Sequence, residues 1–215
     1  MLLRTGEVVD QGRNKALCGE PSSTAAATTT TTTTISRCRA GTEALDTETK
    51  RLVTQVLGEH VGILKPRWNE NEALSTMKRV VDHVLGKYSY VYNGMLDGLS
   101  LDDRGDDVTF VRAIAKSLFA DGTVNWGRVV SLVAFGAALS EYLKDKGRES
   151  CVELVGEEIA VYMLTDQKDW MTENNSWHGF VEFFRPADRG SAVSNALMTI
   201  AGVAGIGATL TLLIM

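Results

Sequence analysis

The residues whose types and spacing suggest a specific interaction are the Asn-Trp-Gly-Arg run at positions 125–128, which opens a long apolar stretch. Arg128 is the only charge between Gly122 and Ser140, a pattern typical of a helix buried on every side. A cation in the first helical turn opposes the helix dipole, which favours anions there by about 0.3–1 kcal/mol. Arg128 therefore calls for a carboxylate, either on a partner chain or within this chain, where Asp121 and Asp107 are the candidates.

Each residue of this run has a predicted task. Asn125 can cap the helix or accept a hydrogen bond, and Trp126 can anchor the helix start against the core. Gly127 lets another helix approach closely, and Arg128 offers two parallel N–H donors to a carboxylate. The apolar residues of 108–119, with Met95 and Phe135, either line a groove for an amphipathic helix or simply pack in the core.

Catalytic and cofactor chemistry is not indicated. The three histidines, His60, His83 and His178, lie far apart, and the chain has no phosphate loop, nucleophile elbow or HExxH motif. Glu157-Glu158 is typical of a solvated helix face. We therefore predict no enzyme, no metal, no cofactor and no small-molecule substrate. The net charge of −5 argues against nucleic acid, and three scattered cysteines fit a reducing compartment.

Apolar periodicity predicts an all-α domain over residues 44–187 of the 215-residue chain. The expected helices span about 45–57, 74–85, 108–119, 125–144 and 151–165, with short pieces near 169–173 and 177–184. Pro66 falls in a break between the first two, residues 94–105 are predicted to be loop-rich, and Asp106 or Asp107 is placed to cap the third. Residues 1–43, with seven consecutive threonines, are predicted to be a disordered regulatory tail or tether.

The C-terminal segment has a different composition. Residues 191–215 carry no charge over 25 positions, which meets the requirement of roughly 20 residues for crossing a bilayer. Residues 192–215 are predicted to be a transmembrane tail anchor, with Arg185 and Arg189 on the cytosolic side. The alternative is a last core helix held in the domain's own groove.

Three segments carry a family resemblance. Residues 121–136 resemble the first homology region of the Bcl-2 family of apoptosis regulators. Residues 168–170 with 176–184 resemble the second region, and residues 73–84 resemble the third, the BH3 or death-helix motif. Glu149-Ser150-Cys151, together with residues 179–184 and 201–205, is similar to the myeloid-cell-leukaemia (Mcl-1) branch, which opposes apoptosis. The resemblance covers residues 45–215.

The resemblance implies a Bcl-2-like helical bundle around a central apolar helical hairpin, about 125–144 and 150–166, with a C-terminal transmembrane helix. It also implies a surface groove that captures BH3 helices, with Arg128 pairing with the partner's aspartate beside Asn125 and Gly127. The groove walls carried over by position are Met95, Val111, Ala115, Leu118, Leu132 and Phe135. The chain's own BH3-like motif comprises Met77, Val80, Asp82 and Val84.

The function implied is that of an anti-apoptotic regulator that sequesters pro-apoptotic BH3-only and Bax/Bak-like proteins, preventing mitochondrial outer-membrane permeabilisation. Its expected location is the mitochondrial outer membrane, or also the endoplasmic reticulum or nuclear envelope, with the body facing the cytosol. Val81 stands where the death motif has a small residue, which favours a receptor over a death ligand. The alternatives are a pro-apoptotic pore-forming member and a tail-anchored trafficking protein.

Overall fold

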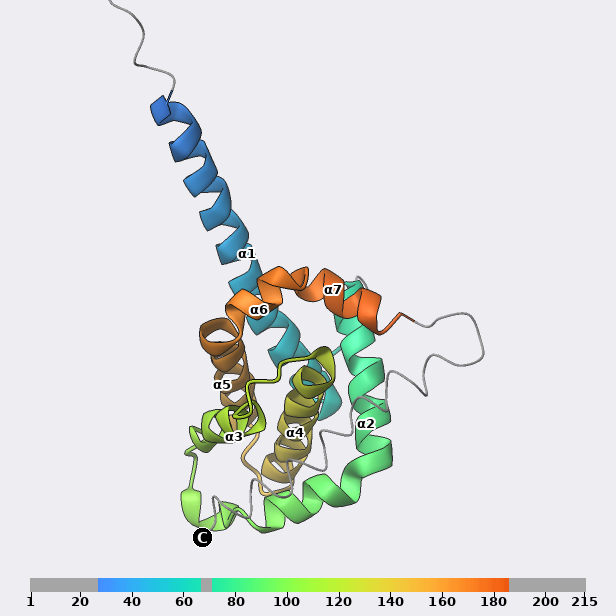
Figure 1. Ribbon diagram of the computed structural model, residues 1–215. Coiled ribbons are helices and arrows are strands. Elements are labelled where there is room, and N and C mark those ends of the chain that lie inside the picture. The colour runs from blue at the N-terminus through green and yellow to red at the C-terminus, as the bar shows by residue number, and fades with distance from the viewer. Residues whose placement is uncertain (1–26, 67–70, 186–215) are drawn as a thin grey trace, which may run out of the picture. The chain divides into compact units, whose positions relative to one another are not determined.

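The computed structural model describes residues 27–66 and 71–185, and the side chains before residue 43 lie outside this description. The chain divides into two units, residues 1–40 and 41–215, which are treated separately. Within the described residues all regular structure is helical, which confirms the predicted all-α class. Figure 1 shows the elements, which are α1 (Ala27–His60), α2 (Glu72–Asp97), the 3-10 helix η1 (Leu101–Arg104), α3 (Phe110–Leu118), α4 (Trp126–Asp145), α5 (Cys151–Asp166), α6 (Lys168–Glu173) and α7 (Ser176–Phe183).

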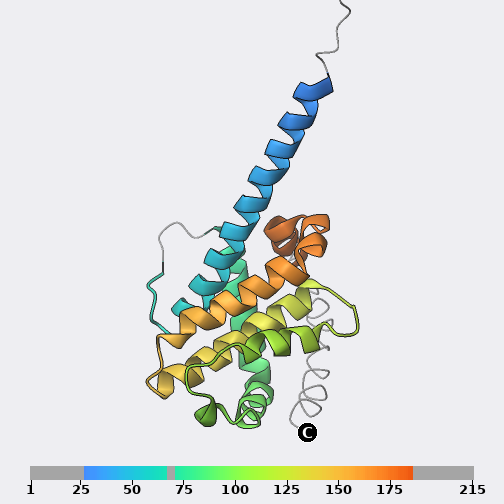
Figure 2. The ribbon, with the colours of Figure 1, turned by 90° about the vertical axis from the view of Figure 1, so that its left-hand side faces the viewer.

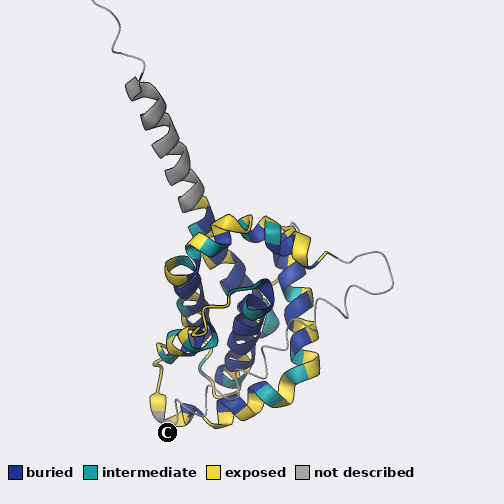
Figure 3. Cartoon of the chain, in the orientation of Figure 1, coloured by how far each residue is buried: buried dark blue, intermediate teal, exposed yellow. Residues whose placement is uncertain are grey.

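Helix α4 is the centre of the second unit. Every residue from Val129 to Ser140 is buried, so this helix is dark along most of its length in Figure 3. Its two buried serine hydroxyls donate hydrogen bonds to carbonyls of the same helix. Ser131 Oγ donates to Gly127 O at 3.0 Å, and Ser140 Oγ donates to Gly136 O at 2.7 Å. No hydroxyl proton in this stretch is left without an acceptor, which removes the main cost of burying polar groups.

The other helices surround α4. In the views of Figures 1 and 2, α2 and α5 lie on opposite sides of α4, and α3 packs on both α4 and α5. The apolar stripe predicted at residues 45–57 is buried in the same core as the stripe of α2. Each amphipathic helix thus turns its apolar face to the central helix, as the hydrophobic periodicity predicts.

A tight turn closes the predicted hairpin of α4 and α5. Gly147 has φ +73°, a left-handed conformation that favours glycine. The amide of Gly147 donates to Lys144 O at 2.8 Å, and that of Arg148 donates to Leu143 O at 2.8 Å. These bonds satisfy carbonyls at the end of α4, so the chain reverses within a few residues.

Two helix boundaries differ from the predicted ones. Helix α1 begins at Ala27, so the structure has helix over residues 27–43, where the composition predicts disorder. No glycine or proline interrupts residues 22–40, and extending an existing helix costs less than starting one. Helix α2 continues through Gly94 to Asp97, because Met95 and Leu96 are buried and their packing outweighs the weak helix propensity of glycine.

The predicted tail anchor, residues 192–215, lies outside the described residues. Among the residues that are described, no helix is both long and apolar enough to cross a membrane.

We predict that the contact of α5 with α1 tolerates no added methyl group. A Cβ on Gly156 would lie 3.2 Å from the backbone Cα of Thr54, so Gly156→Ala should lower the free energy of unfolding by about 1–3 kcal/mol. Gly86 on α2 has nothing within 4 Å of its would-be Cβ, so Gly86→Ala is the control and should stabilise by about 0.5–1 kcal/mol. Urea unfolding of both variants measures this, and a neutral Gly156→Ala would contradict the close packing.

Candidate functional site

The start of α4 is shaped by the side chain of Asn125. This residue has extended backbone angles (φ −156°, ψ 161°), and its Oδ1 accepts a hydrogen bond from the Arg128 amide at 2.9 Å. The carboxamide therefore caps an amide of the first helical turn, which has no i−4 carbonyl partner and otherwise bonds to Asn125 O at 3.1 Å. The predicted capping role of Asn125 is confirmed, and Gly127 beside it is buried.

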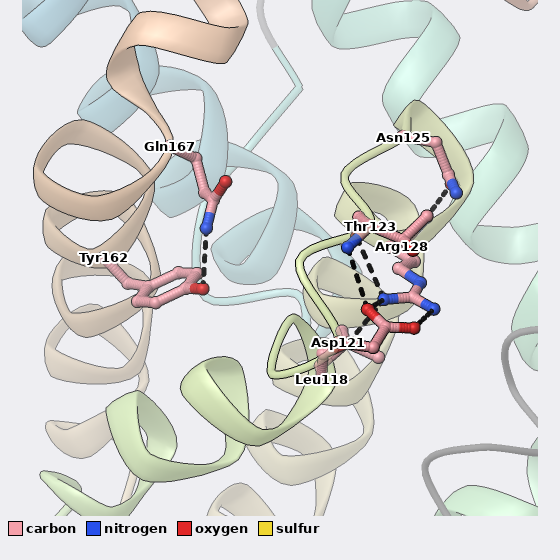
Figure 4. A network of polar contacts seen from close by, with 7 residues as sticks. All are labelled: Leu118, Asp121, Thr123, Asn125, Arg128, Tyr162 and Gln167. Atoms are coloured by element: carbon pink, nitrogen blue, oxygen red, sulfur yellow. Dashed lines mark hydrogen bonds and ion pairs between the residues drawn. The ribbon is translucent and has the colours of Figure 1, made fainter.

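Arg128 forms an internal ion pair with Asp121. Its Nη1 donates to Asp121 Oδ1 at 2.5 Å and its Nη2 to Asp121 Oδ2 at 2.6 Å, a two-pronged contact that Figure 4 shows. Of the two internal carboxylates that the sequence allows, Asp121 is the partner, while Asp107 bonds to Thr109 instead. Asp107 closes a turn before α3, but the N-cap of α3 is Thr109 and no side chain caps it, so the predicted capping by Asp106 or Asp107 is wrong.

Two backbone carbonyls complete the surroundings of the guanidinium. Nη1 also donates to Leu118 O at 3.0 Å, at the last residue of α3, and to Thr123 O at 2.9 Å. Carbonyls at a helix C-terminus lack helical partners and carry partial negative charge. An arginine that opposes the dipole of α4 is therefore favoured by the dipole of α3, which accounts for a cation at this position.

The ion pair shifts the pKa of Asp121 and the pKa of Arg128 in opposite directions. Hydrogen bonds from Arg128, and next from the Thr123 amide, hold the pKa of Asp121 well below its ordinary range. The hydrogen bond that Arg128 donates to Asp121 in turn raises the pKa of Arg128. The carboxylate side chain is 57% exposed and the arginine side chain 17%, so the pair lies at the surface with its arginine partly covered.

A cluster of aromatic side chains packs around Trp126 at the start of α4. The ring of Trp126 lies 4.7 Å from that of Trp170, 5.9 Å from that of Trp177 and 5.6 Å from that of Phe180. Trp177 Nε1 donates to Thr49 Oγ1 at 2.9 Å, which ties this cluster to α1. The predicted anchoring of Trp126 against the core is confirmed, and edge-to-face contacts of this kind add about 0.5–1.5 kcal/mol each.

The end of α3 is supported from α5. The ring of Phe119, just after α3, lies 5.6 Å from that of Tyr162. The Tyr162 hydroxyl accepts a buried hydrogen bond from Gln167 Nε2 at 2.8 Å (Figure 4). Burial raises the pKa of Tyr162 above its ordinary value. The packing of its ring on Phe119 lies next to the Leu118 carbonyl that accepts from Arg128.

The six apolar residues predicted to line a groove come from three helices. Five of them are buried in the common core, and Leu118 is half-buried against it. They are Met95 on α2, Val111, Ala115 and Leu118 on α3, and Leu132 and Phe135 on α4. All six thus belong to, or pack against, the one hydrophobic core of the described residues, and the groove that they are predicted to line stays a prediction.

The chain's own BH3-like segment lies on α2. Met77, Val80 and Val84 are buried in the core, whereas Asp82 is exposed. Asp82 Oδ1 lies 3.7 Å from His60 Nδ1 at the end of α1. The apolar face of this segment is therefore used within the fold.

Sequence reasoning did not find two of the groups that hold Arg128. They are the carbonyls of Leu118 and Thr123, which are backbone atoms and leave no signal in residue type.

Among the described residues, no group of His, Cys, Asp and Glu is arranged to hold a metal ion.

Residues 77–177 match the family model described as apoptosis regulator proteins of the Bcl-2 family. The anti-apoptotic protein NR13 of Gallus gallus is 37% identical over 103 residues, 45% of this chain and 58% of that protein. Bcl-2-like protein 1 of Homo sapiens is 37% identical over 71 residues, 33% of this chain and 30% of that protein. The chain thus spans little more than half the length of NR13.

Solved structures agree with this match. The crystal structure of a zebrafish pro-survival protein, NRZ, superposes with a TM-score of 0.60 at 26% identity, covering 68% of this chain and 97% of that one. The same protein in complex with a Bad BH3 peptide superposes equally well, with a TM-score of 0.60 over 67% of this chain and 97% of that one. An all-helical bundle around a buried central helix is the architecture that these proteins share. The chain contains a Bcl-2 family domain.

We predict that Arg128 controls the titration of Asp121. Because the pKa of Asp121 is depressed in the folded chain, the pair contributes stability above the pKa of an unfolded aspartate, and this contribution is lost as pH falls through the folded pKa. In NMR titrations of the side-chain carboxyl carbon, Asp121 should therefore titrate below the ordinary aspartate range. In Arg128→Ala it should return toward that range, while Asp107 should not change. Identical Asp121 curves in both proteins would contradict the pairing.

Proposed function

We propose that this chain is an anti-apoptotic regulator. In this proposal it binds BH3 helices of pro-apoptotic Bcl-2 family proteins and thereby prevents mitochondrial outer-membrane permeabilisation. The support is the Bcl-2 family domain, together with relatives named as anti-apoptotic and pro-survival, one of them in complex with a Bad BH3 peptide. The observation that carries the proposal is the partly exposed arginine at the start of the buried central helix, in a domain whose core takes apolar residues from α2, α3 and α4.

The proposed binding step exchanges internal contacts for external ones. A BH3 helix presents apolar anchors on one face at helical spacing, together with an aspartate. Met95, Val111 and Leu132 are buried in the free chain, so the anchors can reach them only if α2 or α3 shifts on α4. The aspartate binds the guanidinium of Arg128, which is partly exposed in the free chain.

A receptor role suits the chain better than the role of a death ligand. The apolar face of its own BH3-like segment is buried, with Met77 and Val84 fully enclosed, so α2 would have to leave the core before that face could bind elsewhere. Membership of the Mcl-1 branch is also proposed, on residues 149–151 and 179–184. Cys151 opens α5, and Phe180 belongs to the aromatic cluster under Trp126.

The membrane part of the proposal rests on composition. Residues 192–215 are proposed to anchor the chain in the mitochondrial outer membrane, since residues 191–215 carry no charge and Arg185 and Arg189 precede them.

The binding proposal is tested with a labelled Bad BH3 peptide and the full chain, by fluorescence anisotropy. Truncating one partner of a buried, hydrogen-bonded charge pair costs about 2–5 kcal/mol, so Arg128→Ala should raise the Kd about thirtyfold or more. Lys50→Ala removes the same charge from an exposed position on α1 and should leave the Kd unchanged. An unchanged Kd for Arg128→Ala, with native helicity by circular dichroism, would exclude the assigned role of Arg128.

The anchor is tested in cells by comparing the full chain with a form ending at residue 190. The full chain should stay with mitochondrial membranes after alkaline carbonate extraction, and the shortened form should be released. Retention of the shortened form would locate membrane attachment elsewhere in the chain.

A further inference from the structure

The guanidinium of Arg128 uses only some of its N–H donors within the described part of the chain. Its Nη1 faces three oxygens, those of Leu118, Asp121 and Thr123, and its Nη2 donates one hydrogen to Asp121. An arginine has five N–H donors in a planar fork. The described part of the chain supplies no acceptor for the Nε hydrogen or for the second hydrogen of Nη2.

The occupied and unoccupied donors lie on different edges of the fork. Asp121 takes the end formed by Nη1 and Nη2. The two remaining donors, Nε–H and one Nη2–H, are parallel to each other and form a second edge of the planar guanidinium. Two parallel donors of this kind fit the two oxygens of a carboxylate.

Asp121 is itself held in place by the turn between α3 and α4. Its Oδ1 accepts from the Thr123 amide at 2.9 Å, and Gly122 between them has φ +73°. Because the aspartate side chain is 57% exposed, it adds little to the core, and its main contact is with Arg128. The segment 118–128 thus forms a clamp on one end of the guanidinium (Figure 4).

We propose that Asp121 is a positioning residue, which holds Arg128 by its Nη1/Nη2 end so that the Nε/Nη2 edge is presented to the carboxylate of a bound helix. This rests on the proposed function and deepens it, because it makes Asp121 a determinant of selectivity for partners that carry that carboxylate. Fixing a long side chain before binding removes an ordering cost worth about two- to tenfold in Kd. The opposite role, in which Asp121 competes with the partner for Arg128, would require both carboxylates to use one edge.

The test compares two peptides on the full chain, the Bad BH3 peptide and its variant with the BH3 aspartate replaced by asparagine. The quantity measured is the ratio of their Kd values, which reports selectivity for the carboxylate. Asp121→Asn should reduce this ratio about two- to tenfold, because a loosened arginine discriminates less. Asp107→Asn removes the same charge from an exposed residue whose side chain accepts from Thr109, so the ratio should not change.

A second measurement reports directly on the Nε/Nη2 edge of Arg128. In NMR spectra the Nε–H signal of Arg128 should shift on binding the aspartate peptide and shift much less with the asparagine peptide. A purely structural role for Asp121 would lower stability or weaken both peptides equally, without altering their ratio.

The outcomes separate the two proposals. A ratio that stays constant or rises in Asp121→Asn would overturn the positioning role, and a rise would indicate competition. Equal binding of both peptides by the wild-type chain would keep the proposed function and overturn the inference about Arg128. Failure of the wild-type chain to bind either peptide would overturn both.

Discussion

Burial of α4 on every side is the constraint on which the other elements depend. A helix without a polar face is stable only where other helices cover it completely, and here α2, α3 and α5 supply that cover. Their apolar stripes face α4, and an ion pair between Arg112 and Glu158 joins α3 to α5. The aromatic cluster of Trp126, Trp170 and Trp177 closes the N-terminal end of the same helix. The shape of the second unit follows from enclosing one apolar segment.

The same constraint gives Arg128 its chemical role. The first turn of a fully enclosed helix is the place where its chain emerges from the core, so a charge there lies at the boundary between apolar surroundings and solvent. The end of α3 brings Leu118 O to that boundary, and the following turn brings Asp121. An arginine that would destabilise an isolated α4 is thereby compensated within the fold.

Residue pattern predicted most of the helices because amphipathic periodicity is a local property. The stripe of residues 45–57, the hairpin of α4 and α5 and the capping by Asn125 are all observed. The boundaries at Ala27 and Asp97 were not predicted. Threonine runs and glycine lower helix propensity by a few tenths to about 1 kcal/mol per residue, which helix extension or tertiary packing can outweigh.

The candidate site was also predicted in part from the sequence and in part only from the structure. Residue type and order were enough to single out residues 125–128 and to limit the internal partners of Arg128 to Asp121 and Asp107, since a lone cation in an apolar run requires a counter-charge. Which carboxylate meets it, and by which edge, depended on the left-handed turn at Gly122 and on the packing of α3 against α4. Those contacts depend on how the turn between two successive helices folds back on the second helix, and backbone carbonyls such as that of Leu118 carry no residue-type signal. Periodicity and motifs therefore specify the helices and the charged residue, whereas the packing of the helices specifies what that residue binds.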